Sequence, residues 1–203
     1  MTTCCIYVEG GGNRNKALKL SCQKAFATLL KSCGYENSKF RVIACGGRNA
    51  AYQRFQTAHS ANSASSVMLL VDSEDPVADI EQTWSHLQQR DDWVKPHGAD
   101  DNQVLLMTTC METWMVADRD TLKSHYRRDC FMESALPALT NLESRDRSSI
   151  QNALVNATRA CKNSYSKNKR SYELLGELKR RALDTDRLPS FRRLIRILDV
   201  KLS

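Results

Sequence analysis

Four short apolar segments alternate with helical patterns in the first half of the chain, and this alternation constrains the fold more than any other feature. The apolar segments are residues 3–8, 40–45, 67–72 and 103–109. Residues 14–33 and 49–60, between them, repeat apolar positions at helical spacing. The pattern predicts an α/β fold: a mostly parallel, four-stranded, Rossmann-like sheet with helices on both faces.

The third apolar segment and the residues that follow it refine this prediction. Residues 67–71 are almost continuously apolar, as is typical of a strand buried on both faces of a parallel sheet. Pro76 suits the first turn of a helix, so we expect a helix from there to about residue 90, with Asp75 as its N-cap. Another helix is expected from about residue 111.

The second half of the chain is helical and basic. Helical patterns occur in residues 149–163, in residues 172–183 and after Pro189. We therefore expect a core of residues 1–128 and a helical extension of residues 129–203 packed on it. Residues 157–203 hold 13 Lys and Arg but only 5 Asp and Glu, in a chain whose net charge is +7. Such a basic segment indicates a polyanionic partner, or else the solvated faces of ordinary helices.

Composition narrows the class of protein. Hydrophobic residues make up 41% of the chain, enough for a core, yet no stretch reaches the length of a membrane span. The first residues lack the pattern of a secretory signal. The eight cysteines show neither a Cys-x-x-Cys pair nor zinc-finger spacing, so we expect buried thiols in a reducing, cytoplasmic compartment.

Acidic residues end two of the predicted strands. Glu9 follows the first strand, and Asp72 and Glu74 follow the third. Ligands in such sheets bind beyond the carboxyl ends of the strands, and carboxylates suit a hard cation such as Mg²⁺ or Mn²⁺. If the backbone stays extended after residue 71, Asp72 and Glu74 face the same cleft. These three residues are the predicted catalytic and metal-binding set, and a solvated turn is the alternative for the pair.

Other residues near the strand ends are weaker candidates. Glu112, after the fourth strand, is either a further metal ligand or an acid that favours the helix dipole. Glu9 precedes three glycines, which would allow close approach of a phosphate, although a flexible turn is the alternative. The tyrosine at 165 opens a basic segment with Lys167 and Arg170. The predicted phosphate or nucleic-acid contacts are Gly10, Gly11, Arg14, Lys16, Arg48 and Lys169.

These motifs together resemble the TOPRIM fold, in which one strand ends in Glu and a later strand ends in Asp-x-Asp or a close variant. The matching residues are Glu9, Asp72 and Glu74, with Glu74 where many TOPRIM domains have Asp. The chain is also similar to a family called domain of unknown function 4276. That likeness rests on short motifs along nearly the whole chain: Tyr7–Gly10, Gly46–Arg48, Val71–Asp75, Glu112–Trp114, Lys169–Leu175 and Ser190–Leu194.

The resemblance implies an activity and a context. TOPRIM domains serve topoisomerases, primases and nucleases of the OLD family, so it implies Mg²⁺-dependent cleavage of DNA or RNA. It also implies an SMC-like or AAA-type ATPase partner in bacterial anti-phage defence. The main alternative is a non-catalytic module that binds an ATPase or RNA. A nucleotide phosphotransferase is a weaker one, because phosphatases with an Asp-x-Asp nucleophile usually carry it after the first strand.

Overall fold

A four-stranded, all-parallel sheet forms the centre of the protein. The computed structural model describes residues 4–12, 14–61, 67–127, 129–167 and 169–202. The strands are β1 (Cys4–Val8), β2 (Phe40–Ala44), β3 (Val67–Asp72) and β4 (Val104–Met107), in the order β2-β1-β3-β4. In register, Val8 lies opposite Ala44 on one side and Leu70 on the other. The predicted Rossmann-like α/β fold is confirmed.

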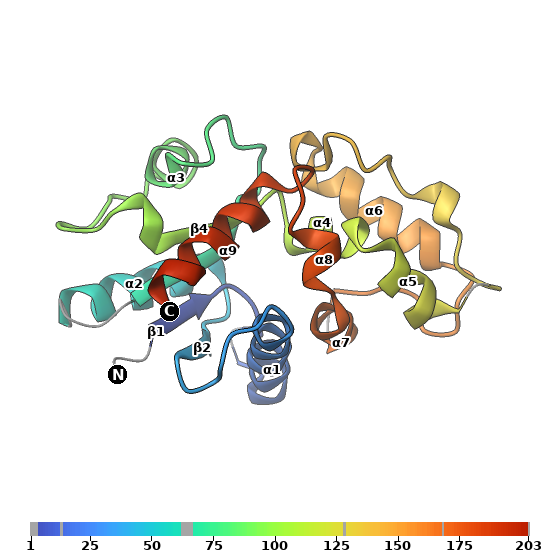
Figure 1. The fold of residues 1–203 in the computed structure, drawn as a ribbon, viewed down its shortest axis with the longest axis horizontal. Coiled ribbons are helices and arrows are strands. Elements are labelled where there is room, and N and C mark those ends of the chain that lie inside the picture. The colour runs from blue at the N-terminus through green and yellow to red at the C-terminus, as the bar shows by residue number, and fades with distance from the viewer. Residues whose placement is uncertain (1–3, 13, 62–66, 128, 168, 203) are drawn as a thin grey trace.

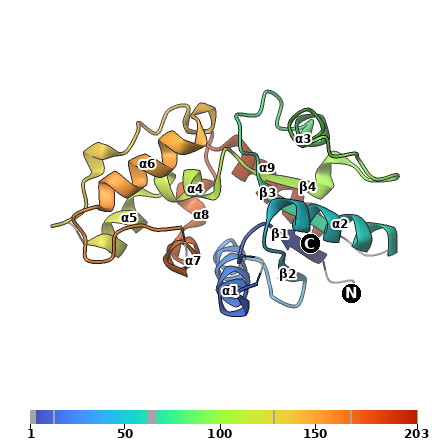
Figure 2. The same ribbon diagram turned by 180° about the vertical axis from the view of Figure 1, so that it is seen from behind.

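Helices cover both faces of this sheet (Figures 1 and 2). Along β3, Val67, Leu69 and Val71 pack with residues of α2 (Arg48–Ala61) and α3 (Thr83–Asp91). Met68 and Leu70 belong to the opposite face, which α1 (Lys16–Ser32) covers. The strand is buried at all six positions, in line with the apolar run of its first five residues.

The C-terminal half is helical and joins the same core. Its helices are α4 (Met111–Ala117), α5 (Arg119–Tyr126), α6 (Arg147–Thr158), α7 (Lys169–Glu177), α8 (Arg180–Leu183) and α9 (Pro189–Lys201). Short 3₁₀ turns are η1 (Asp101–Gln103), η2 (Glu133–Ala135) and η3 (Leu142–Ser144). Helix α7 packs on α1, and α9 packs on β4.

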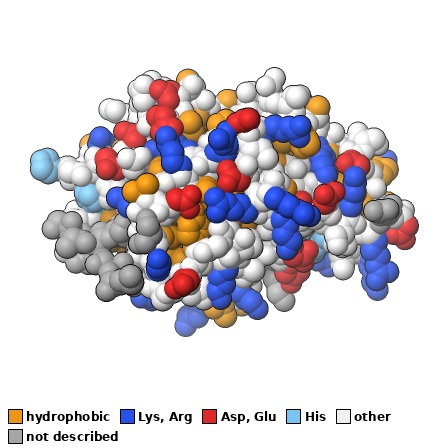
Figure 3. Space-filling model, viewed as in Figure 1, with side chains coloured by type: hydrophobic (Ala, Val, Ile, Leu, Met, Phe, Trp, Pro, Cys, Tyr) orange, Lys and Arg blue, Asp and Glu red, His pale blue; other side chains and the backbone are white. Residues whose placement is uncertain are grey.

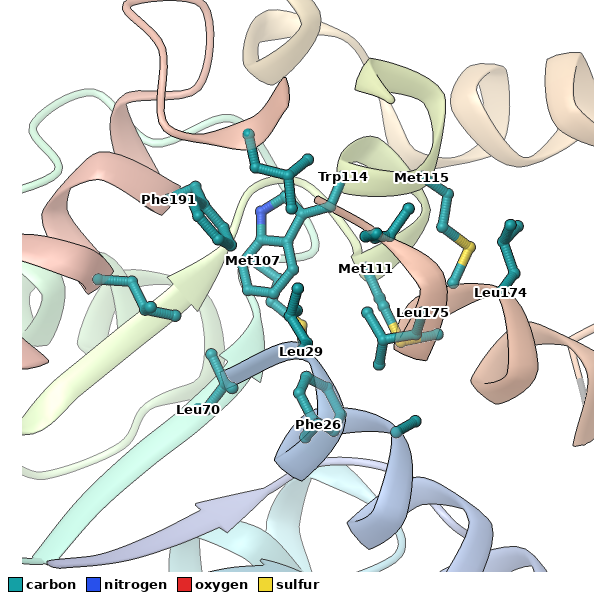
Figure 4. Packing of buried hydrophobic residues seen from close by; sticks show 14 of the residues in the cluster. Phe26, Leu29, Leu70, Met107, Met111, Trp114, Met115, Leu174, Leu175 and Phe191 are labelled. Carbon is teal, nitrogen blue, oxygen red and sulfur yellow. The ribbon is translucent and has the colours of Figure 1, made fainter. Parts of the chain in front are cut away.

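A cluster of large side chains joins the two halves (Figure 4). Trp114 of α4 is fully buried, and its ring meets that of Phe191 from α9 edge-on, with 5.0 Å between ring centroids. Phe26 and Leu29 of α1 and Leu175 of α7 belong to the same cluster. The carboxyl ends of the strands thus point toward the helices of the C-terminal half.

A buried arginine links α9 to the edge of the sheet. Arg193 is 4% exposed. Its guanidinium donates to the carbonyl oxygens of Val104 and Asp101, both at 2.7 Å, and to Glu81 at 3.1 Å. These partners satisfy a cation that burial alone would strongly disfavour.

The predicted helix start at Pro76 is wrong, because α3 begins at Thr83. The side chain of Asp79 accepts from the amide of Glu81 at 2.9 Å and holds a turn in the intervening segment. Asp101, from another part of the chain, accepts from the amide of Trp84 at 2.8 Å and so caps the helix. Asp75 is therefore not the N-cap. It pairs with Arg90 at 3.0 Å.

Two cysteines depart from the predicted reduced thiols. A disulfide joins Cys130 to Cys161, with 5.0 Å between their Cα atoms. The other six cysteines take no part in this disulfide, and all but Cys5 are buried. Across the described residues, no helix has the length and apolar character needed to cross a membrane.

Candidate functional site

Three carboxylates meet at the carboxyl end of the sheet. Glu9 lies directly after β1, Asp72 ends β3, and Glu74 lies two residues further on. One carboxylate oxygen from each lies within 4.8 Å of the others. Strands β1 and β3 are neighbours whose crossovers lead to opposite edges of the sheet. Their ends therefore form the topological switch point, where parallel sheets commonly bind ligands.

Asp72 is the buried member of this acidic triad, as we call Glu9, Asp72 and Glu74. It is 4% exposed, and its Oδ1 accepts from the amide of Met111, at the start of α4, at 2.8 Å. Burial, and next the charges of Glu9 and Glu112, raise the pKa of Asp72 from 3.8 to about 7. Nearby cations offset only part of this increase, so Asp72 is well placed for a further positive charge.

Glu74 reaches the triad through a turn rather than an extended chain. Its φ is +68°, which a non-glycine residue adopts only with strain. Its amide donates to the carbonyl of Thr109 at 2.9 Å, and that of Ser73 donates to the carbonyl of Met107 at 3.0 Å. Asp72 and Glu74 do face the same site, as predicted. The backbone reaches this arrangement through a bend that these two hydrogen bonds hold, and not through the extended chain that the prediction assumed.

Glu9 is positioned by a closely packed glycine loop. Gly10 and Gly46 exchange backbone hydrogen bonds of 2.8 Å. A Cβ on Gly10 would come within 2.7 Å of the hydroxyl of Tyr172, and the amide of Gly11 donates to that same hydroxyl at 2.7 Å. This amide is thus already used, which weakens the predicted phosphate contact of the loop.

One oxygen of Glu9 lacks a hydrogen bond. Its Oε2 is buried and accepts none from the described residues, although Nη1 of Arg48 lies 3.6 Å away. Arg48 itself donates to the backbone oxygen of Asp72, binds Asp91 at 2.6 Å and stacks over the ring of Trp93. Its guanidinium is thus already bound within the protein and supports the triad. The predicted contact between Arg48 and a phosphate would have to compete with these bonds.

Glu112 lies beside the triad, although it is not part of the group of three that could share one ion. It is fully buried. Its Oε1 accepts from the hydroxyl of Tyr165 at 2.7 Å, and its Oε2 has no hydrogen-bond partner among the described residues. Lys167 joins the two acidic groups, with Nζ 3.8 Å from Oδ2 of Asp72 and 3.9 Å from Oε1 of Glu112.

Cations that the sequence did not link to the acids surround the triad. Arg147, the first residue of α6, pairs with Glu74 and lies 3.7 Å from Oδ2 of Asp72. Arg90 lies 3.8 Å from Oε2 of Glu74. A positive residue in the first turn of a helix, where the dipole disfavours it, is the one local signal that marks Arg147.

The remaining predicted phosphate contacts are not gathered at the triad by any observed bond. Arg14 and Lys16 are exposed on either side of Asn15, whose side chain caps α1 by accepting from the amide of Leu18. The side chain of Lys169 lies outside the part of the chain that the structure describes. These three contacts stay predictions.

The basic surface of the C-terminal half is interspersed with acids (Figure 3). Arg180 pairs with Asp184 at 3.1 Å, and Arg196 pairs with Glu81 at 2.6 Å. These ion pairs neutralise part of the positive charge from which the sequence predicted a polyanionic partner. The cations that face the triad are therefore better candidates for contact with an anion.

The triad fits a hard divalent cation. All its donors are carboxylate oxygens, which Mg²⁺ and Mn²⁺ prefer. A cation would give the orphaned Oε2 of Glu9 a partner and relieve the repulsion among three close negative charges. Glu9, Asp72 and Glu74 are the residues that would hold it.

Comparison with known proteins identifies a family. No curated protein and no solved structure is significantly similar to this chain. A family model described as a domain of unknown function, DUF4276, matches residues 8–199, which include the triad and nearly all of the helical half. The chain belongs to the DUF4276 family.

Proposed function

We propose that this protein is a metal-dependent nuclease that hydrolyses phosphodiester bonds of DNA or RNA. The observation that carries the proposal is the meeting of Glu9, Asp72 and Glu74 within 4.8 Å at the switch point of a parallel sheet. The order of these acids along the chain resembles the TOPRIM pattern, so a TOPRIM-like nuclease is the specific form of the proposal.

Each acid has a role that its surroundings support. Asp72 and Glu74 would hold Mg²⁺ or Mn²⁺, which when bound polarises a phosphoryl oxygen and acidifies water. Asp72 is held in place by the amide of Met111. Glu9, with one oxygen lacking a hydrogen bond among the described residues, completes the site as a ligand or as a general acid or base. Glu112 would be a further ligand or would position water.

The direct test is a nuclease assay on single- and double-stranded DNA and RNA with Mg²⁺, Mn²⁺ or a chelator. Glu9→Gln and Asp72→Asn are each expected to abolish metal-dependent cleavage while leaving the fold intact by circular dichroism. Glu36→Gln changes an exposed acid outside the triad and should cleave like the wild type. Full activity in either triad variant would reject the assignment.

The proposed context is an ATPase-coupled effector of bacterial anti-phage defence that acts in the cytoplasm. It rests on the likeness to TOPRIM partners of SMC-like ATPases. Co-expression with an ATPase encoded beside this chain, followed by co-purification and cleavage assays, tests it. Failure of that ATPase to bind or to change cleavage would contradict the context without contradicting the nuclease.

A second candidate is a non-catalytic module that binds a partner ATPase or RNA. It is favoured by the ion pairs that Arg48, Arg90, Arg147 and Lys167 already make with the triad. A thermal melt with millimolar Mg²⁺ or Mn²⁺ separates the two candidates. A metal site raises the midpoint by mass action, and an idle acidic site does not.

A further inference from the structure

Two cations from the C-terminal half contact carboxylate oxygens of the acidic triad. Arg147 pairs with Oε2 of Glu74 and lies 3.7 Å from Oδ2 of Asp72. Lys167 lies 3.8 Å from the same Oδ2 and 3.9 Å from Oε1 of Glu112. The protein itself therefore supplies positive charge to these acids, although it offsets only part of their effect on the pKa of Asp72.

These two cations differ from Arg48 in how firmly they are held. The side chains of Arg147 and Lys167 are 28% and 49% exposed, whereas that of Asp72 is 5% exposed. They thus lie on the solvent side of the carboxylates. Arg48 is 12% exposed and is clamped by Asp91 and the ring of Trp93. Arg147 and Lys167 can swing outward without opening the core, and Arg48 cannot.

A bound divalent cation would compete with both side chains. Mg²⁺ binds carboxylate oxygens at about 2.0–2.1 Å, so a metal ion on Oδ2 of Asp72 or Oε2 of Glu74 would compete with the cationic side chain that contacts the same oxygen. Like charges a few ångströms apart also repel. Once displaced, the two side chains remain at the mouth of the site, where an anion is their natural partner.

We propose that Arg147 and Lys167 are exchange residues, which leave the carboxylates when the metal binds and then contact a phosphate of a nucleic-acid strand. Metal and phosphate then bind cooperatively. The metal displaces the two cations toward the phosphate, and the phosphate holds them away from the carboxylates that bind the metal. The inference rests on the proposed function in taking the triad as the metal site, but it concerns binding and not cleavage.

The test is the affinity for Mn²⁺, measured by electron paramagnetic resonance of the free ion, with and without a short phosphorothioate oligonucleotide. Arg147→Gln and Lys167→Gln remove a competing charge, so each should bind Mn²⁺ about two- to fivefold more tightly when no oligonucleotide is present. In the wild type the oligonucleotide should tighten Mn²⁺ binding, and in the double variant this coupling should vanish.

Two control variants separate exchange from other effects. Lys162→Gln removes the same unit of charge from an exposed residue near Lys167, and its Mn²⁺ affinity should match that of the wild type. Arg147→Lys keeps the competing charge and should also bind Mn²⁺ like the wild type. Weaker or unchanged Mn²⁺ binding in folded Arg147→Gln and Lys167→Gln would overturn the proposal.

The outcomes distinguish this inference from the nuclease. If the wild type cleaves nucleic acid but its Mn²⁺ affinity does not change when the oligonucleotide is added, the exchange proposal is wrong and the nuclease proposal stands. If the variants bind Mn²⁺ more tightly and the wild type shows the coupling, but the protein cleaves no substrate, the exchange would stand and the nuclease would be rejected. Absence of Mn²⁺ binding in every variant would overturn the exchange by removing the metal site on which it rests.

Discussion

Asp72→Asn is expected to flatten the pH dependence of folding stability between pH 5 and pH 8 when a chelator removes metal. In the folded protein, burial and then the charges of Glu9 and Glu112 raise the pKa of Asp72 from 3.8 to about 7. The folded chain therefore holds this proton more tightly than the unfolded chain. The stabilisation that comes from this proton is complete at pH values below the pKa of Asp72 in the unfolded chain. It is lost as the pH rises through about 7, the pKa of Asp72 in the folded protein.

The size of the effect follows from the difference in pKa. One unit corresponds to about 1.4 kcal/mol, so ionisation of Asp72 lowers the free energy of unfolding by roughly 2 to 3 kcal/mol between pH 5 and pH 8. Glu143 contributes a similar decrease, because burial raises its pKa from 4.5 to about 7. Glu81 and Asp91 have lowered pKa values and titrate below this window.

The assay is urea denaturation at several pH values, with extrapolation to water. Asp72→Asn should lose about half of the wild-type slope, because its amide oxygen can still accept from Met111 while the side chain no longer ionises. Glu143→Gln is the matched control: it removes the other half and leaves the contribution of Asp72. Stability that rises with pH across the window, or a slope unchanged in Asp72→Asn, would refute the reasoning.

Further changes test two glycines, the core packing and the disulfide by urea denaturation. Gly11→Ala should cost about 2 to 4 kcal/mol, because φ is +84° and a Cβ would also meet the α1 backbone at 2.7 Å. Gly98→Ala, at φ +77° and with no described atom within 4 Å of the new Cβ, should cost about 1 kcal/mol, and equal losses would contradict the steric account. Phe191→Ala should cost about 3 to 5 kcal/mol, since its buried ring packs edge-on against a tryptophan, and a loss below about 1 kcal/mol would contradict this packing. Reduction of the Cys130–Cys161 disulfide, which spans 31 residues, should lower stability by about 3 to 4 kcal/mol, and Cys130→Ser should no longer respond to the reductant.

The sheet could be predicted because each strand is specified by local composition. The run from Val67 to Val71 is apolar at every position, and the structure buries all of them. The start of α3 could not be predicted in the same way. The signal at Asp75 and Pro76 is a genuine helix-start pattern, but the partners that decide the outcome are distant in sequence. Asp101 caps the helix at Thr83 and Trp84, and no local pattern reveals that contact.

The acids of the site were predictable for a topological reason, and the cations were not. Parallel strands bring their carboxyl ends to one edge, so Glu9 and Asp72 had to lie near each other once β1 and β3 were neighbours. Nothing comparable places Arg147, which follows a weakly patterned segment and reaches the triad through the packing of α6 against α4. Such tertiary contacts carry no periodic signal in the sequence.

The number of Lys and Arg residues in the helical half overstates how many of them are available to bind an anion. A count of Lys and Arg treats every cation as free to bind a polyanion, yet Arg192 pairs with Asp186, and Arg193 is buried in the core. The two cations that contact Asp72 are chemically equivalent to these in the sequence and differ only in where the fold places them. A nucleic-acid strand that reached the triad would meet Arg147 and Lys167 first. Substitutions at these two residues should therefore affect nucleic-acid binding more than substitutions of equally basic residues on α9.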